Sequence, residues 1–218
     1  GRLMAVGGFG LGAATSCPTI ADLNDIALPA GLYRVIATTA NSPAALGTVT
    51  ILRNGATRIT QELRELLAGT AGGPLRVREY FDGTWSAWRR VYTTHNLLGS
   101  VSQASGVPTG AVIERGSNAN GEYVRFADGT QLCWCESGDL TADTAHGGIF
   151  RSSEVTLTYP AAFSATPRVA AGYRYVSGTG GWASTAAGGS TTTAPVRIFA
   201  ALTGAVGRVH LIVTGRWF

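Results

Sequence analysis

The chain has 218 residues, and 45% of them are hydrophobic, which is enough for a folded core and excludes wholesale disorder. Charged residues make up only 14%, against about 25% in an average globular domain. No apolar run approaches the roughly 18 residues that a membrane-spanning helix needs, so we expect no membrane insertion. The first residue is Gly, and the sequence does not open on the charged and apolar regions of a signal peptide. We expect this start to be a cut or processed end of a longer chain.

The basic residues are all arginines, 17 in number, and the net charge of +4 mildly favours anionic partners. Residues 155–218 contain five Arg and neither Asp nor Glu. Beyond Arg89–Arg90, the sequence has no arginine cluster and no basic helix of the kind that binds nucleic acid. We therefore expect no nucleic-acid partner.

The three cysteines, Cys17, Cys133 and Cys135, are an odd number. The Cys-x-Cys spacing puts two thiols on one face of a strand, where a bridge between them would be strained. A zinc site would need further ligands at a wider spacing. We expect unpaired thiols in a protein that folds in the cytosol, with no metal and no cofactor.

In the first part of the chain, a Gly-rich lead-in over 1–18 is followed by short β-prone runs, rich in branched and aromatic residues, at 31–38, 47–53, 75–81 and 84–91. Asn54-Gly55 and Asp82-Gly83 predict turns between such runs. Leu63, Leu66 and Leu67 have helical spacing, so residues 60–67 are the helix candidate. Trp85 and Trp88 are expected in the core.

The small, polar and uncharged segment 96–109 predicts a linker, which divides the chain into domains at 19–95 and 110–218. The second domain contains another hairpin signal, Asp128-Gly129, and later strands that alternate between apolar and polar residues. Repeated short strands with turn signals between them predict an antiparallel β-sandwich. Residues 177–194 are Gly, Ser, Thr and Ala apart from one Trp, which predicts an exposed, adaptable loop.

The sequence offers no recognisable catalytic motif, and we expect a protein that is not an enzyme. His95, His146 and His210 are isolated in sequence and are interpreted as structural; His210 should lie on the face opposite Val209 and Leu211, where it could line a subunit axis. A polysaccharide depolymerase would need paired carboxylates, and no spacing points to such a pair.

Binding by surface contact fits the composition better, because sugars are recognised by aromatic faces and planar polar groups. The candidate residues come from the acid-free C-terminal part: Tyr173, Arg174, Tyr175, Trp182, Arg197 and Phe199. Tyr173 and Tyr175 share a strand face with Val169, which favours a core position for both. Arg174, Trp182 and Arg197 are the better candidates for exposed ligand contacts.

Several segments resemble phage tail fibres and the related R-type pyocin fibres. The stretch from Gly31-Leu-Tyr-Arg-Val to Gly83-Thr-Trp-Ser-Ala-Trp-Arg is similar to a pyocin-knob domain, and Met4-Ala-Val-Gly-Gly-Phe-Gly-Leu-Gly12 resembles the lead-in before such domains. Residues 106–134 are similar to the opening of a C-terminal receptor-binding domain of tail fibres. Phe163 to Val169 resembles the Phe-x-x-x-Pro-x-Val pattern of a lectin-like trimeric β-sandwich, and the chain closes on Gly215-Arg-Trp-Phe218. The sequence departs from the family in having no long shaft repeat between knob and tip.

This resemblance implies a mainly β protein, a small β-rich knob followed by a trimeric β-sandwich tip, at the distal end of a homotrimeric tail fibre in a virion. It implies attachment to a bacterial surface glycan such as lipopolysaccharide, and assembly with other tail or baseplate proteins through the upstream part of the fibre. A pilus or other protein receptor, a polysaccharide depolymerase, and a purely structural cap that nucleates the trimer remain as alternatives.

Overall fold

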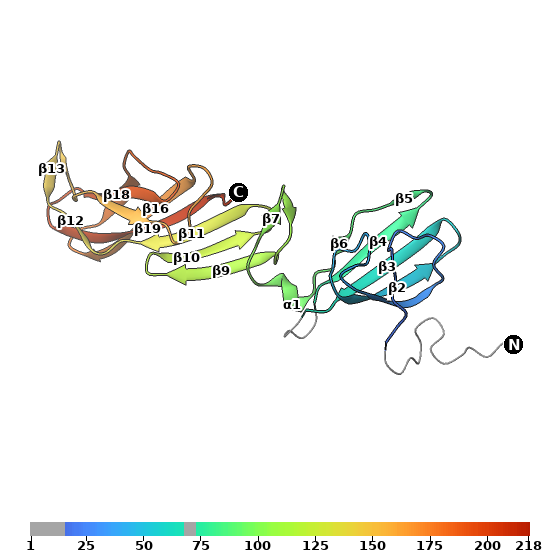
Figure 1. The fold of residues 1–218 in the computed structure, drawn as a ribbon. Coiled ribbons are helices and arrows are strands. Elements are labelled where there is room, and N and C mark those ends of the chain that lie inside the picture. The colour runs from blue at the N-terminus through green and yellow to red at the C-terminus, as the bar shows by residue number, and fades with distance from the viewer. Residues whose placement is uncertain (1–15, 68–72) are drawn as a thin grey trace. The chain divides into compact units, whose positions relative to one another are not determined.

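The computed structural model describes residues 16–67 and 73–218, and its fold is mainly β with antiparallel sheets, as the sequence predicts (Figure 1). The chain divides into two compact units, Gly1–Thr93 and Thr94–Phe218. Most of the predicted lead-in, residues 1–15, lies outside the described residues. Within those residues, the structure contains no helix of the length and apolarity that crossing a bilayer requires.

The first unit contains one six-stranded antiparallel sheet. Four strands pair in chain order, and two short ones both pair with the fourth: β1 (Gly31–Val35), β2 (Gly47–Arg53), β3 (Arg58–Glu65), β4 (Leu75–Phe81), β5 (Thr84–Trp85) and β6 (Arg89–Arg90). Both predicted turns form: Gly55 has φ 108°, and Asp82 and Gly83 have φ 41° and 99°. These positive φ values explain why Gly follows Asn or Asp at each turn.

The predicted helix at 60–67 is wrong, because residues 60–65 belong to strand β3. β3 lies between β2 and β4 and pairs with both along its length. Alternate residues Ile59, Gln61 and Leu63 point into the core, whereas Leu66 and Leu67 lie beyond the strand and are about half exposed. The three leucines have helical spacing but do not share one buried face. The pairing of β3 with two neighbouring strands decides the conformation of this segment, whatever its helical spacing.

A buried arginine organises the core of the first unit. Arg78 on β4 is 4% exposed, and its guanidinium lies 4.1 Å from the ring of Trp85 and 4.5 Å from the ring of Trp88. It donates hydrogen bonds to Gln61 Oε1 at 2.9 Å and to the Leu23 carbonyl at 2.7 Å. Both Trp side chains pack against the core, as expected, and the Trp-x-x-Trp motif encloses a charge that also anchors the segment before β1.

The segment predicted as a linker, 96–109, is structured as part of the second unit. It includes the second half of α1 (Thr94–Leu97) and a small hairpin of β7 (Gln103–Ala104) and β8 (Val107–Pro108). The Val101 amide donates to Glu114 Oε2 at 2.8 Å, and the Gly99 amide to the Ile113 carbonyl at 3.0 Å. Because these contacts are made by backbone groups, the small side chains of the segment carry no sign of them.

The second unit consists of two antiparallel sheets. The large sheet has six strands, with β19 paired to β11, β12 and β16: β9 (Ile113–Asn118), β10 (Gly121–Phe126), β11 (Thr130–Glu136), β12 (Leu140–Ala142), β16 (Arg168–Ser177) and β19 (Ala205–Arg216). The small sheet has five strands, with β18 paired to β14, β15 and β17: β13 (Thr144–His146), β14 (Ile149–Arg151), β15 (Val155–Thr158), β17 (Gly181–Thr185) and β18 (Thr193–Ala200).

The core of the second unit lies between these two sheets. The large sheet contributes a row of buried side chains that includes Cys133, Val209 and Leu211, and the small sheet contributes Val196 and Ile198. Alternate residues on each strand point away from this core, so each sheet has an inner and an outer face. The predicted antiparallel sandwich is confirmed for this unit. At the Asp128-Gly129 turn only Gly129 has a positive φ, 94°, as at Asn54-Gly55 and unlike at Asp82-Gly83.

The expected loop at 177–194 contains strand β17, which pairs with β18 over residues 181–185. Backbone hydrogen bonds form this strand, and they do not require large side chains. Gly181 permits the close approach of β17 to β18, because a Cβ at this position would lie 2.3 Å from the Phe199 carbonyl oxygen. The segment therefore adds an edge strand to the sandwich and fixes the position of Trp182.

Cys133 and Cys135 lie in the core as thiols that form no disulfide. Burial raises the pKa of Cys135 to about 11 and raises that of Cys133 above its ordinary value. Such thiols remain protonated at neutral pH, which suits packing and not nucleophilic or redox chemistry.

Candidate functional site

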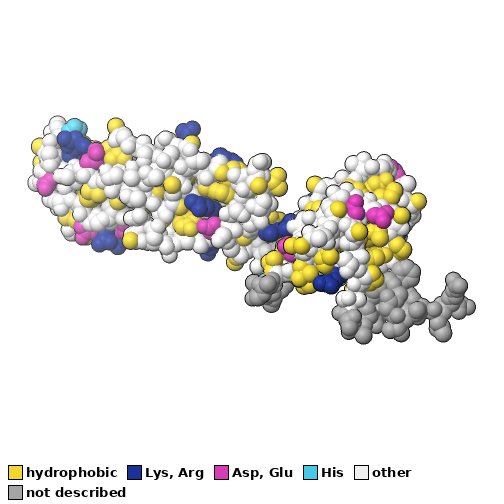
Figure 2. Space-filling model, viewed as in Figure 1, with side chains coloured by type: hydrophobic (Ala, Val, Ile, Leu, Met, Phe, Trp, Pro, Cys, Tyr) yellow, Lys and Arg dark blue, Asp and Glu magenta, His cyan; other side chains and the backbone are white. Residues whose placement is uncertain are grey.

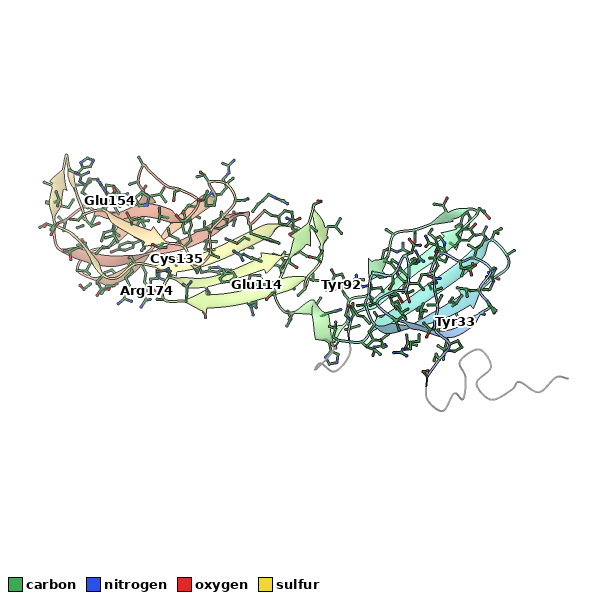
Figure 3. The ribbon with its side chains drawn as sticks, viewed as in Figure 1. Tyr33, Tyr92, Glu114, Cys135, Glu154 and Arg174 are labelled. Carbon is green, nitrogen blue, oxygen red and sulfur yellow. The ribbon has the colours of Figure 1, made fainter. Side chains whose placement is uncertain are left out.

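The six predicted binding residues lie on both sheets of the second unit and do not form one site. Three are on β16 of the large sheet (Tyr173, Arg174 and Tyr175), and three are on β17 and β18 of the small sheet (Trp182, Arg197 and Phe199). Figure 3 shows Arg174 and Glu154, the ion-pair partner of Arg197, on opposite sides of the sandwich. The candidates therefore divide into two surfaces with different chemistry.

The two tyrosines of β16 differ in their surroundings. Tyr173 is half-buried against the core, as expected, and its hydroxyl donates to the Val206 carbonyl at 3.3 Å. Its ring lies over Gly207, where a Cβ would come within 2.2 Å of it. Gly207 is also the cross-strand neighbour of Tyr175, so the space beside Tyr175 is already filled. Tyr175 is 57% exposed, and the expectation that it lies in the core is wrong.

Arg174 lies in a charged cluster on the outer face of the large sheet. Its Nη1 is 2.9 Å from Glu136 Oε1, and the same oxygen is 3.4 Å from both Arg208 Nη1 and His210 Nε2. Arg208 also pairs with Asp139. His210 is exposed while Val209 and Leu211 are buried, as the alternation predicts. Because Glu136 already neutralises Arg174, this arginine is a weaker ligand contact than its exposure suggests.

The outer face of the small sheet carries a row of side chains from three neighbouring strands. Trp182 on β17 lies opposite Phe199 on β18, and Phe199 lies opposite Arg151 on β14. The rings of Trp182 and Phe199 stack at 5.8 Å with an angle of 13° between their planes. The His146 ring lies 6.3 Å from Phe199. Trp182 is 47% exposed, so this row presents an aromatic surface to solvent.

Arg197 stands beside this row on β18 and pairs with Glu154, Nη2 to Oε2 at 2.7 Å. Its Nε is buried and has no hydrogen-bond partner in the structure. Arg197 is two residues before Phe199 on β18, so the two side chains lie on the same face of the strand. The charge of Arg197 is balanced by Glu154.

The sequence reasoning missed Arg151 and interpreted His146 as structural. Arg151 belongs to a three-residue strand with no pattern to mark it, and only the register of β14 against β18 places it beside Phe199. The signal that could have suggested it is its position as the single Arg between the Cys-x-Cys segment and the acid-free C-terminal part.

The described residues contain no group of three or more His, Cys, Asp and Glu side chains arranged to hold a metal ion. The carboxylates of the second unit are largely occupied by ion pairs, with Glu114 on Arg125, Glu136 on Arg174 and Glu154 on Arg197. On the face shown in Figure 2, charged side chains are sparse and lie in small groups among uncharged surface. The arrangement supplies flat aromatic and cationic contact area.

These features define the second unit as an antiparallel β-sandwich with an aromatic, cationic outer face. No family model matches the chain, and no curated protein matches it. Among solved structures, the R1 pyocin fibre of P. aeruginosa is similar at 16% identity and a TM-score of 0.36, covering 91% of this chain and 66% of that one. The R2 pyocin fibre of P. aeruginosa is similar at 18% identity and a TM-score of 0.34, covering 91% of this chain and 65% of that one. An N-truncated R2-type pyocin tail fibre is similar at 17% identity and a TM-score of 0.32, covering 91% of this chain and 96% of that one. The chain thus spans just under two thirds of the first two fibre structures.

Proposed function

We propose that this chain is the distal, receptor-binding part of a homotrimeric phage or pyocin tail fibre, and that the outer face of the small sheet binds a bacterial surface glycan such as lipopolysaccharide. The observation that carries the proposal is the exposed Trp182–Phe199 stack beside Arg151 and Arg197. The Trp-x-x-Trp motif and the segment 106–134, which resemble tail fibres, support the fibre assignment. The protein would fold in the host cytoplasm and join other tail or baseplate proteins through an upstream part of the fibre.

The geometry suits a sugar because the aromatic rings and the guanidinium groups would contact different parts of it. The apolar face of a pyranose packs on an exposed aromatic ring, and guanidinium groups beside the ring donate to hydroxyl or acidic oxygens. Each such contact is weak, but three identical sites on one rigid trimer act together on a repetitive cell surface. A shallow face of this kind then suffices for firm attachment.

The outer face of the large sheet is the surface that we assign to contacts between the three copies. Trp134 is 37% exposed and Ile212, its cross-strand neighbour, is 50% exposed, although outer faces of such sheets are usually polar. Glu136 and Arg174 on this face are paired within the chain, so the exposed apolar side chains are what the face offers to a neighbouring copy. A closed ring of three copies would bury these side chains between subunits.

Binding without catalysis is the function that the carboxylates favour. A depolymerase needs two carboxyl groups free to act on one bond, whereas Glu114, Glu136 and Glu154 are each held by an arginine. Release of reducing ends from purified bacterial polysaccharide would establish the depolymerase alternative. A cap that only nucleates the trimer would not need an exposed aromatic row.

The proposal is tested by measuring how fluorescently labelled chain binds intact bacteria in a flow cytometer, across a panel of strains. We expect saturable binding to some strains, a loss of about tenfold or more in Trp182→Ala, equivalent to ~1.4 kcal/mol, and no change in Phe81→Ala. Phe81 is the matched control, an aromatic side chain 54% exposed in the first unit. Periodate treatment of the cells should abolish binding, and binding that survives it would indicate a pilus or other protein receptor. Equal binding by Trp182→Ala would contradict the assigned face.

A further inference from the structure

We propose that the sugar recognised by the outer face of the small sheet is anionic, and that its carboxylate or phosphate group pairs with Arg151. This inference rests on the proposed glycan-binding function and specifies the chemical class of the ligand. It is carried by the state of Arg151 in the sandwich.

Among the described residues, the Arg151 side chain differs from those of the other second-unit arginines: it is half-buried and has neither an ion-pair nor a hydrogen-bond partner. Most of the others pair with carboxylates or donate to carbonyl groups: Arg125, Arg174, Arg197, Arg208 and Arg216. Arg115 and Arg168 make no such contact either, but they are exposed to water. Water therefore solvates the charges of Arg115 and Arg168, whereas the sheet partly excludes water from the guanidinium of Arg151. A half-buried guanidinium without a counter-ion is costly, and a ligand anion would offset that cost.

The acidic groups near Arg151 are engaged elsewhere. Glu154, three residues further along, is held at 2.7 Å by Arg197. Asp143 precedes Thr144, the cross-strand neighbour of Arg151, and its carboxylate accepts a hydrogen bond from the Thr144 hydroxyl at 3.1 Å. Neither forms an ion pair with Arg151 within the described structure. The guanidinium fork remains available to an incoming anion.

The surroundings of Arg151 match an acidic sugar in shape. Neighbouring strands are about 4.8 Å apart, so the row from Arg151 through Phe199 to Trp182 spans roughly 10 Å, the width of one or two sugar rings. A sugar stacked on Trp182 would place a substituent over Phe199 and toward Arg151. The fork of Arg can receive both oxygens of a carboxylate or two oxygens of a phosphate, whereas Lys offers a single point charge.

The test uses the full chain and glycan purified from strains that it binds, together with polymer conjugates of two matched pairs: galacturonate with galactose, and mannose 6-phosphate with mannose. Carboxyl groups of one glycan sample are reduced to alcohols, and phosphates of another are removed with hydrofluoric acid, so that the two sources of charge are separated. Affinity is measured by biolayer interferometry for wild type, Arg151→Gln, Arg151→Lys and Arg34→Gln. Arg34 is the matched control because its side chain is exposed and forms no ion pair within the described part of the first unit, and its substitution removes the same charge.

We expect one of the two treatments to lower the affinity of wild type for the purified glycan about tenfold. Wild type should likewise bind the matching neutral conjugate about tenfold more weakly than the charged one. Arg151→Gln should bind treated and untreated glycan equally weakly, Arg151→Lys should be intermediate, and Arg34→Gln should match wild type. Equal affinity of wild type for charged and neutral glycans, or wild-type affinity in Arg151→Gln, would overturn the inference. If Trp182→Ala still abolishes binding in that case, the glycan-binding function stands. If neither cells nor glycans are bound, both proposals fail.

Discussion

Replacing Arg78 by methionine should destabilise the first unit by about 3 kcal/mol. The two hydrogen bonds that the guanidinium donates contribute ~3–6 kcal/mol together, and its contacts with the two Trp rings add ~1–2 kcal/mol. Against this, burial lowers the pKa of Arg78 from 12.5 to about 10, which corresponds to a cost of ~3 kcal/mol for keeping the charge inside. The hydrogen bonds and ring contacts therefore contribute more than the buried charge costs. Methionine removes the cost of the charge but also loses those interactions.

The assay is amide hydrogen exchange of the full chain, followed in β3 and β4 by mass spectrometry, because these strands report the first unit separately. Arg58→Met is the matched control. Its guanidinium also lies over an aromatic ring, 3.9 Å from that of Phe81, but its side chain is 50% exposed. Exposed pairs of this kind contribute less than about 1 kcal/mol. If Arg78→Met loses no more protection than Arg58→Met, the buried guanidinium does not organise this core.

Two further outcomes follow from the second unit. Because burial raises the pKa of Cys135 to about 11 from 9.0, the unfolded chain loses this proton first as pH rises. The stability that the protonated thiol contributes is complete below pH 9 and is lost as pH approaches 11; urea midpoints measured across this interval should fall further in wild type than in Cys135→Ala, and parallel curves would refute this. Separately, Ile212→Asp should convert a trimer into monomers in light scattering, while Leu202→Asp, at another exposed apolar side chain, should leave the trimer intact. A monomeric wild type would exclude the proposed assembly.

The fold class could be predicted because its signals are local. Asp82-Gly83 and Asn54-Gly55 mark turns by the backbone conformations that they tolerate, and alternation from Val209 to Val213 shows which face of a strand is buried. The error at 60–67 has the same origin. A few leucines at helical spacing cannot reveal that two neighbouring strands will pair with their backbone.

The site was less accessible to sequence reasoning. Trp182 stands out in a stretch of small residues, but nothing in that stretch indicates a strand, and so nothing indicates that Trp182 stacks on Phe199. Arg174 and Arg197 look equivalent in sequence, and the structure separates them onto opposite faces, each with its own carboxylate. Arg151 became a candidate only through the register of β14 against β18.

The sequence by itself determined the mainly β character, the turns and the alternating strands, because each depends on residues close together in the chain. The tertiary structure alone decided which side chains share a surface, since strands far apart in sequence become neighbours only when the sheets form. It also decided which arginines have counter-ions, because an ion pair such as Arg197 with Glu154 joins residues that no local pattern connects. The tertiary structure therefore determines which arginines beside the aromatic row keep an unbalanced charge.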